Sequence, residues 1–248
     1  MKACAVIPIH DHGDTIGEVL AGLAPAGIDC LVVDDGSNLA TREILERIAK
    51  EHHFVEVLRR TRNGGKGSAL KAGYRAALAR GFTHVVQLDA DGQHDPRDVP
   101  RFLEAMRAHP DALVLGVPIF DASAPRARIL ARQISRVLVW LACHSRAVPD
   151  PLCGFRGIPL QPTVALLDRE RLGDWMDFDP ELAVRLVWEG LPVVPVPTDV
   201  VYRIGGLSHF SLTRDYPRLA LLYARLVVGG VRRSSALRQR APGASGIR

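Results

Sequence analysis

The amino-acid sequence predicts an α/β protein with a mostly parallel central sheet and helices on both faces. Three observations lead to this prediction. Short apolar runs alternate with longer amphipathic stretches along the first hundred residues, the apolar runs are continuous, and several of them end in aspartate or glycine. Continuous apolar strands separated by helices are typical of parallel sheets whose two faces are both buried.

The elements of the first half follow in order. A helix is predicted after the run LVVDDGS because Ile44, Leu45 and Ile48 fall on one helical face, and the next helix is expected to end at Gly81. The expected order is strand 3–9, helix 15–23, strand 29–35, helix 40–52, strand 54–59, helix 68–81 and strand 83–88. In sheets of this kind, ligands bind at the carboxyl ends of the strands.

The second half is less regular. It is expected to contain helix 97–109, strand 112–119, a long amphipathic helix 127–145, helix 180–190, a proline-interrupted strand 191–202 and helix 216–233. No element is predicted between Pro149 and the helix that begins at 180. Residues 1–233 are therefore predicted to form one domain, and the polar, small-residue segment 234–248 a disordered tail.

Composition narrows the class of protein. The chain of 248 residues is 47% hydrophobic and has a formal net charge of +5, with Lys and Arg scattered until the C-terminus. This charge suits anionic partners, and composition alone leaves nucleotides, phospholipid surfaces and nucleic acid open. Four cysteines without paired metal spacing favour a reducing compartment, and no run of about 18 apolar residues predicts a spanning helix. The protein is expected to be cytoplasmic.

Aspartates follow two of the predicted strands. Asp34 and Asp35 end the second strand, and Asp89 and Asp91 end the fourth. If these strands are close in the sheet, their carboxylates converge on one crevice, where Mg²⁺ or Mn²⁺ shared with substrate phosphates would relieve the repulsion. The alternative is that the aspartates only form turns and helix caps. Two Asp-rich strand ends, each followed by glycine, favour a binding site.

The stretch NGGKGSALKAG, residues 63–73, brings glycines and Lys66 to the start of a predicted helix. Backbone N–H groups at a helix N-terminus favour anions, so Lys66 is a candidate phosphate contact. The stretch lacks the spacing of a P-loop, and the alternative is a plain glycine-rich turn with a solvated lysine.

Four motifs, in their order and spacing, resemble family 2 glycosyltransferases of the GT-A fold: AVIPIHDHGDTI, LVVDDGS, NGGKGSAL and LDADGQHDP. The similarity is greatest to polyprenyl-phosphate sugar transferases of the dolichyl-phosphate mannose synthase type, and it extends to DPLCGFRG, FDPELAVRL and VYRIGGLSHF. Together the motifs span residues 5–210. The resemblance implies a GT-A, Rossmann-like domain with a nucleotide-binding half (1–116) and an acceptor half (117–233).

The resemblance also implies roles for single residues. It assigns donor binding to Pro8, His10, Asp34, Asp35, Lys66, Asp89, Arg203 and Ser208, and metal binding to Asp91, Asp89 and Gln93. Asp91 would be the main metal ligand, and Arg203 and Ser208 would reach the diphosphate. The chain departs from the family where His10 and Asp11 replace a Tyr-Asn pair, where Phe178 replaces a Glu, and where His209 stands in place of a frequent Lys.

The implied reaction is an inverting, metal-dependent transfer of a sugar from a UDP- or GDP-sugar to a hydrophobic or lipid-linked acceptor. A metal bridging the two phosphates would stabilise the departing nucleoside diphosphate while an acceptor oxygen attacks the anomeric carbon from the opposite face. A hydroxyl acceptor needs a general base, whereas a lipid phosphate does not. Asp179 is the first candidate base and Asp150 the second, and the alternative for both is a helix-cap or loop carboxylate.

Partners and rival functions stay open at this level. The amphipathic segments 126–146 and 216–233 can lie on the inner face of a membrane or pack on the sheet, and nucleic acid is not expected as a partner. One rival is a sugar-nucleotide nucleotidyltransferase, which would carry a GxGxR signature where this chain has PIHDHGDTI. The other is a catalytically idle nucleotide-binding scaffold. The donor base, the sugar, the acceptor and the oligomeric state are not predicted.

Overall fold

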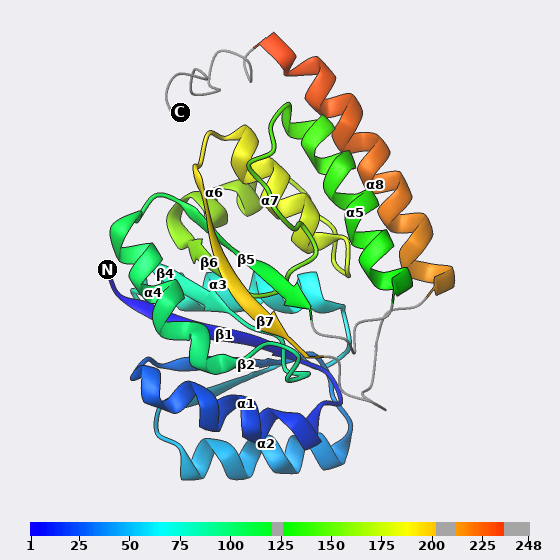
Figure 1. Ribbon diagram of the computed structural model, residues 1–248. Coiled ribbons are helices and arrows are strands. Elements are labelled where there is room, and N and C mark those ends of the chain that lie inside the picture. The colour runs from blue at the N-terminus through cyan, green and yellow to red at the C-terminus, as the bar shows by residue number, and fades with distance from the viewer. Residues whose placement is uncertain (121–125, 202–211, 236–248) are drawn as a thin grey trace.

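The described part of the chain, residues 1–120, 126–201 and 212–235 of a computed structural model, contains one sheet of seven strands. The strand order is β3-β2-β1-β4-β6-β5-β7 (Figure 1). The strands are β1 (Ala3–Ile9), β2 (Cys30–Asp34), β3 (Val55–Arg59), β4 (His84–Gln87), β5 (Leu113–Phe120), β6 (Arg156–Pro159) and β7 (Val193–Val200). β6 is antiparallel to its neighbours β4 and β5, and the other adjacent pairs are parallel. The predicted α/β fold with a mostly parallel sheet is confirmed.

Helices cover both faces of the sheet, as predicted. They are α1 (Gly13–Leu23), α2 (Leu39–Glu51), α3 (Lys66–Ala79), α4 (Val99–Ala108), α5 (Arg126–Cys143), α6 (Leu160–Arg169), α7 (Phe178–Trp188) and α8 (Leu212–Arg232), with short 3-10 helices at Ala24–Ala26 and Pro96–Asp98. Alternate residues of β1 and β2 point to opposite sides, so the sheet separates two apolar cores. One core packs against α1, α2 and α4, and the other against α3, α5, α6, α7 and α8.

The strand register aligns the carboxyl ends of the first strands at one edge. Ile9 of β1 is level with Asp34 of β2, which is level with Arg59 of β3. β4 ends earlier, at Gln87 opposite Val6, and the Leu88 amide then donates to the Val6 carbonyl. The segment that follows β4 therefore begins beside the last residues of β1, and its Ala90 carbonyl accepts a hydrogen bond from the Thr15 hydroxyl of α1.

Two elements were not predicted, β6 and α6. β6 has only four residues, RGIP, and all four are buried. Its first residue is a fully buried arginine, Arg156, and a short strand with Arg, Gly and Pro carries neither an apolar run nor an alternating pattern. α6 begins directly after β6 without a connecting loop, which removes the turn signal that would separate the two.

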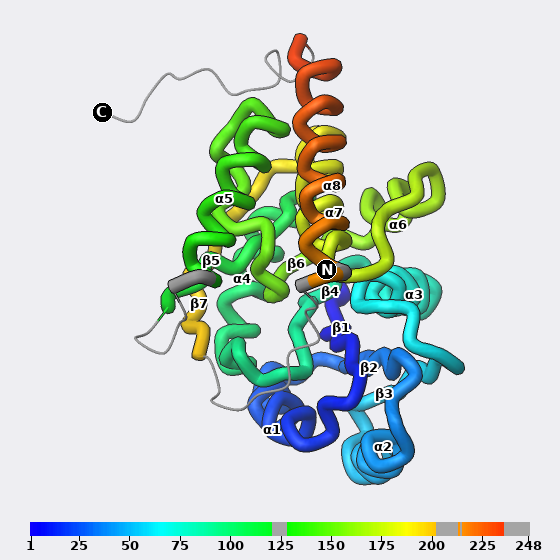
Figure 2. Tube along the Cα trace, turned by 90° about the vertical axis from the view of Figure 1, so that its right-hand side faces the viewer, coloured from blue at the N-terminus to red at the C-terminus, as the bar shows by residue number. Residues whose placement is uncertain are grey.

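The helices α5 and α8 form a layer outside the second core. In Figures 1 and 2 they lie side by side, at the end of the molecule remote from α1 and α2. The His144 ring nitrogen Nε2 lies 3.1 Å from the Gly230 carbonyl, which connects the ends of the two helices. Within the described residues, no helix is both long and apolar enough to cross a bilayer.

The division at residue 116 and the tail stay predictions. Strands from both predicted halves belong to the same sheet, because β5, β6 and β7 continue it beyond β4. The segments 121–125, 202–211 and 236–248, which include nearly all of the expected tail, lie outside the described residues.

Candidate active site

Lys66 lies at the centre of the carboxyl edge of the sheet. It is the first residue of α3, which begins two residues earlier than predicted. Gly65 precedes it with a φ of 95°, a conformation that favours glycine, and a side chain there would overlap the Asp174 carbonyl and the Trp175 ring. The glycine-rich turn thus fixes the place where Lys66 enters the site.

The Lys66 ammonium lies between two carboxylates from distant parts of the chain. Its Nζ is 2.6 Å from Asp89 Oδ1 and 2.8 Å from Asp179 Oδ2. Burial alone would lower the pKa of Lys66, but Asp179 and Asp89 outweigh burial and raise the pKa above its ordinary value. Lys66 is therefore a permanent cation in this edge of the sheet.

Asp179, the first candidate base, is engaged on both oxygens. Oδ2 meets Lys66, Oδ1 accepts a hydrogen bond of 3.1 Å from Gln87 Nε2, and only 7% of the side chain is exposed. Burial tends to raise the pKa of Asp179, but the cations Lys66 and Arg156 lower it below its ordinary value. A carboxylate that is stabilised as an anion is a weak base, so the geometry favours a positioning role for Asp179.

Arg156, the first residue of β6, was not predicted as part of the site. Its guanidinium donates to three carbonyls, those of Cys153 at 2.7 Å, Pro151 at 2.7 Å and Asp179 at 2.6 Å. It thus joins the loop that follows Asp150 to the start of α7. A signal for this role exists in the sequence, because an Arg next to the apolar run CGF must either be exposed or have buried acceptors.

Gly154 brings that loop against the end of β4. A Cβ atom at this position would overlap the Asp89 carboxylate and lie 2.9 Å from Lys66 Nζ. Only glycine lets the backbone approach Asp89 this closely. The loop from Asp150 to Gly154 therefore belongs to the same site as the carboxylates after β4.

Asp89 and Asp91, the predicted metal ligands, form an acidic pair after β4. Burial and the neighbouring Asp89 raise the pKa of Asp91 to about 6, although the Gln93 amide donates to Asp91 Oδ1 at 3.0 Å. Asp89 Oδ1 is buried, and its contact with Lys66 is an ion pair rather than a directed hydrogen bond. Asp89 thus has Lys66 as its cation, whereas the positive charge near Asp91 does not outweigh its burial and the Asp89 charge.

This donor set fits a divalent metal that is shared with a substrate. Asp89, Asp91 and Gln93 offer hard oxygen ligands of the kind that Mg²⁺ and Mn²⁺ prefer. Within the described residues no group of three His, Cys, Asp or Glu side chains is arranged to hold a metal by itself. Mg²⁺ is often bound in this way, through one or two carboxylates completed by substrate phosphates.

Asp34 and Asp35 are buried, and their carboxylates accept hydrogen bonds from backbone amides of the loops that follow β2 and β3. Asp34 Oδ1 accepts from the Ser37 amide at 2.9 Å, and Asp34 Oδ2 lies 3.3 Å from Arg59 Nε. Asp35 accepts from the amides of Gly64 and Gly65 and forms an ion pair with Arg60. Both aspartates therefore stabilise the two loops at the expected nucleotide site, and direct contact with the base stays a prediction.

The first loop is held in place by the residues of the His10-Asp11 replacement. Asp11 adopts a φ of 57°, a left-handed conformation that Asn and Asp tolerate better than other side chains. Its Oδ1 accepts from the Asn38 amide at 2.7 Å, and His10 Nδ1 lies 3.1 Å from the Asp35 carbonyl. Pro8 is buried in β1 opposite Val33, one residue before the strand ends. Arg203 and Ser208, expected at the diphosphate, lie outside the described residues.

A hollow lies between β5 and α5. It has a volume of about 150 Å³ and is lined by Val117, Pro118, Phe120, Ile129, Arg132, Gln133, Arg136, Pro149 and Asp150. Asp150, the second candidate base, forms a 2.8 Å ion pair with Arg132. Its other oxygen accepts from the Leu152 amide at 2.8 Å. The loop with Gly154 connects this hollow to Asp89.

The α/β fold, with its mostly parallel seven-stranded sheet, is that of GT-A glycosyltransferases. The sequence pattern of glycosyl transferase family 2 matches residues 4–154, and the chain belongs to this family. This assignment confirms the expected family and favours it over both rival functions.

One curated relative and two solved structures illustrate the similarity. The undecaprenyl-phosphate mannosyltransferase of Micrococcus luteus is 39% identical over 221 residues, which cover 85% of this chain and 88% of the relative. Glucosyl-3-phosphoglycerate synthase of Mycobacterium tuberculosis, solved with Mn²⁺ and UDP-glucose, has a TM-score of 0.65 at 18% identity, covering 99% of this chain and 81% of the other. A mannosyltransferase of Pyrobaculum calidifontis, solved with GDP-mannose and Mn²⁺, has a TM-score of 0.58 at 16% identity. The match covers 99% of this chain and 76% of the other.

Proposed function

We propose that the protein transfers a sugar, with inversion, from a nucleoside-diphosphate sugar to a polyprenyl phosphate. Mannose is the first sugar to test, because the Micrococcus luteus relative is a mannosyltransferase that acts on undecaprenyl phosphate. GDP-mannose and UDP-sugars are the candidate donors, since solved structures of the same fold hold UDP-glucose or GDP-mannose.

The observation that carries this proposal is the state of the two candidate bases. Asp179 is paired with Lys66, and Asp150 is paired with Arg132, at 2.8 Å in each case. A hydroxyl nucleophile would need a carboxylate free to accept its proton. A phosphate monoester is already an anionic nucleophile and loses no proton in the attack. Two ion-paired carboxylates are therefore better suited to a phosphate acceptor than to an alcohol.

The residues present would hold a divalent metal at Asp89, Asp91 and Gln93. When bound there, Mg²⁺ or Mn²⁺ would act as a Lewis acid that stabilises negative charge on the departing nucleoside diphosphate. Lys66 supplies a fixed positive charge beside Asp89. Asp179, which accepts a hydrogen bond from Gln87, holds the ammonium in place, so that its charge is preorganised before the donor binds.

The hollow beside α5 supplies the chemistry that an acceptor phosphate requires. Arg132 and Arg136 line it, and the Arg136 Nε is buried without a hydrogen-bond partner. Arginine binds phosphate oxygens with two donors at once, which lysine cannot do. A volume of about 150 Å³ is small compared with the roughly 300–1,000 Å³ of pockets that enclose whole small molecules. The hollow is suited to a headgroup, and a prenyl chain would extend outside it.

An acceptor of this kind is embedded in a membrane by its lipid chain. We therefore propose that the enzyme works at the cytoplasmic membrane surface as a peripheral protein. This proposal agrees with the absence, in the described residues, of a helix suited to span a bilayer.

The test combines donor binding with a choice of acceptors. Calorimetric titration with GDP-mannose and a panel of UDP-sugars, each with and without Mn²⁺, identifies the donor. Transfer is then measured to a short-chain polyprenyl phosphate and to the matching polyprenol, both dispersed in detergent. We expect product with the phosphate and none with the alcohol, and at most a few-fold loss of transfer in Asp179→Asn. Equal transfer to the alcohol would overturn the phosphate acceptor. A loss of several orders of magnitude in Asp179→Asn would overturn the inference that no carboxylate base is needed.

A further inference from the structure

The outer layer of α5 and α8 exposes an unusual share of large apolar side chains. Of the twelve large hydrophobic residues that are exposed in the described part of the chain, eight belong to these two helices. On α5 they are Leu130, Ile134, Val137 and Leu141, each between 48% and 63% exposed. Such a concentration marks an interaction surface, because exposed apolar residues are otherwise scattered singly.

The spacing of these residues places them in stripes. Steps of four, three and four residues along α5 return to the same side of a helix. On α8, the exposed Leu221, Val228 and Val231 follow the same rule, with the exposed Ala224 between them. The stripes are defined here as Leu130, Ile134, Val137 and Leu141 of α5 and Leu221, Val228 and Val231 of α8.

The stripes do not point into the protein. The buried side of α5 carries Val139 and Ala142, and the buried side of α8 carries Leu222 and Leu226, all in the second core. The Ala142 carbonyl also accepts from Trp188 Nε1 of α7 at 3.0 Å. Both helices are thus fixed to the domain by one side, and the stripes lie on other sides.

The charge of this layer indicates what covers it. α5 contains four arginines and no acidic residue, and α8 contains four arginines and one acidic residue, Asp215, which is 1% exposed. The whole chain has 32 basic and 27 acidic residues, so the rest of it has 24 and 26. The two helices therefore account for the entire basic excess of the protein.

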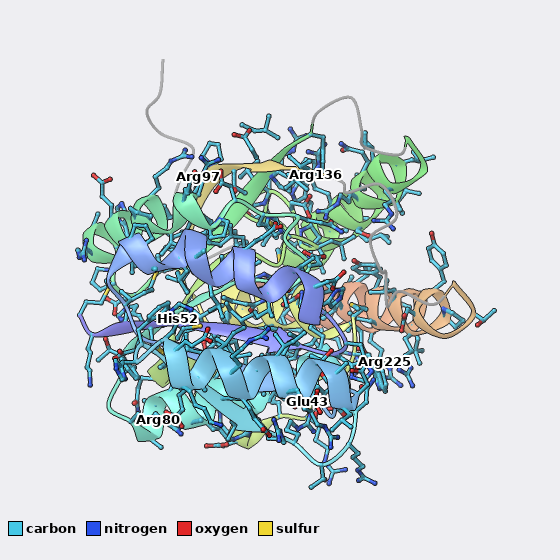
Figure 3. All side chains as sticks on the ribbon, turned by 90° about the horizontal axis from the view of Figure 1, so that it is seen from below. Glu43, His52, Arg80, Arg97, Arg136 and Arg225 are labelled. Carbon is cyan, nitrogen blue, oxygen red and sulfur yellow. The ribbon has the colours of Figure 1, made fainter. Side chains whose placement is uncertain are left out.

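Arginines of this layer pack against the Trp140 ring of α5. Figure 3 labels Arg136 of α5 and Arg225 of α8, which lie apart in that view. The Arg136 guanidinium lies 5.0 Å from the centre of the Trp140 ring, and that of Arg146 lies 5.3 Å from the same ring. Aromatic, aliphatic and arginine side chains in one face are typical of helices that lie in the headgroup region of a bilayer.

We propose that the stripes of α5 and α8 bind the surface of an anionic lipid bilayer, with their apolar side chains inserted and the neighbouring arginines against lipid phosphates. A second copy of the chain suits this face less well, because it would bring arginines against arginines without acidic partners. The inference rests on the proposed function, in which the acceptor is a membrane lipid. Because α5 also lines the hollow with Arg132, docking by this face brings the hollow to the level of the headgroups.

The test is cosedimentation of the full chain with vesicles, in phosphatidylcholine alone and in phosphatidylcholine with added phosphatidylglycerol. The variant is Ile134→Ser with Leu141→Ser, and the matched control is Leu39→Ser, which removes an exposed apolar residue from α2. We expect binding that depends on phosphatidylglycerol and decreases with added salt. The double variant should bind at least tenfold more weakly, and Leu39→Ser should bind like the wild type.

Three results would overturn the proposal. In the first, protein that still binds its donor binds neither kind of vesicle. In the second, the double variant binds vesicles as well as the wild type does. In the third, the wild type is a dimer in solution and the double variant is not. The last result would make the face a contact between copies.

Donor binding and transfer in detergent, measured on the same protein preparations, keep this inference separate from the proposed function. Transfer to polyprenyl phosphate in detergent without vesicle binding would refute the docking face alone. Vesicle binding without any donor binding would refute the proposed function alone. Thermal unfolding of both variants verifies that they are folded.

Discussion

Asp91→Asn should make the metal-free protein more stable while it removes metal-dependent donor binding. The reason lies in the pair Asp89 and Asp91, because burial and the Asp89 charge raise the pKa of Asp91 from 3.8 to about 6. Each unit of pKa difference corresponds to about 1.4 kcal/mol, so ionised Asp91 costs the native state at most about 3 kcal/mol at neutral pH. Asp91 keeps partial access to water, and we expect a gain of about 1–3 kcal/mol from the amide.

The gain should depend on pH in a defined direction. In the native wild type, Asp91 takes up its proton as the pH falls through about 6, whereas in the unfolded chain this happens only near 3.8. The wild type therefore recovers the lost stability between pH 6 and 3.8, and the advantage of Asp91→Asn should be full above pH 6 and vanish below 3.8.

Urea unfolding in the presence of a chelator, from pH 4 to 8, measures this difference. Asp111→Asn, at an exposed carboxylate before β5, is the control and should show no such dependence. A variant less stable than the wild type at pH 7.5, or a gain that does not change with pH, would refute the reasoning about the acidic pair. Calorimetry with Mn²⁺ and the donor should in parallel show lost binding.

Three further predictions concern the same edge of the sheet. Gly154→Ala should weaken Mn²⁺-dependent donor binding at least tenfold in calorimetry, because a Cβ there would displace the Asp89 carboxylate. The control Gly17→Ala, whose Cβ would have nothing within 4 Å, should bind the donor like the wild type. Lys66→Met should lower the free energy of unfolding by about 3–5 kcal/mol, because the buried Asp179 and the partly buried Asp89 lose their common cation. Adding Asp179→Asn should restore part of this loss, and strictly additive effects in urea unfolding would contradict the pairing. Burial lowers the pKa of His94 to about 4. The free energy of unfolding of the wild type should therefore fall by up to about 3 kcal/mol relative to His94→Gln as the pH falls from 6.5 to 4. Parallel curves of stability against pH for the two proteins would contradict this.

Much of the fold could be predicted because its strands are simple. β1, β2 and β4 are almost entirely buried, so they appear as continuous apolar runs, and their order with α1 to α3 follows from alternation. β6 could not be predicted in this way. Its pairing with β4 and β5 depends on Arg156, whose burial is possible only because carbonyls from two other segments accept its hydrogen bonds.

The site was predictable to the extent that its residues are close in sequence. Asp89 and Asp91 are two positions apart after one strand, and together with Asp34 and Asp35 at the end of another they suggested a metal. The pairing of Asp179 with Lys66 and Gln87 was not foreseen, because Gln87 and Asp179 are separated by 92 residues and no local pattern relates them. The role of Asp179 as a base stays a prediction, and its place between Lys66 and Arg156 became apparent only from the structure.

The ion pairs around Lys66 have a thermodynamic consequence for how ligands bind. Asp89, Asp91 and Asp179 with Lys66 and Arg156 give the edge a formal charge of −1 when all are ionised. A divalent cation alone would turn this to +1, and a diphosphate alone would turn it to −3. Binding both together returns the edge to −1. Each ligand should thus raise the affinity of the other by the same factor, since such coupling is reciprocal. A metal and a nucleotide sugar would then bind this protein as one cooperative unit.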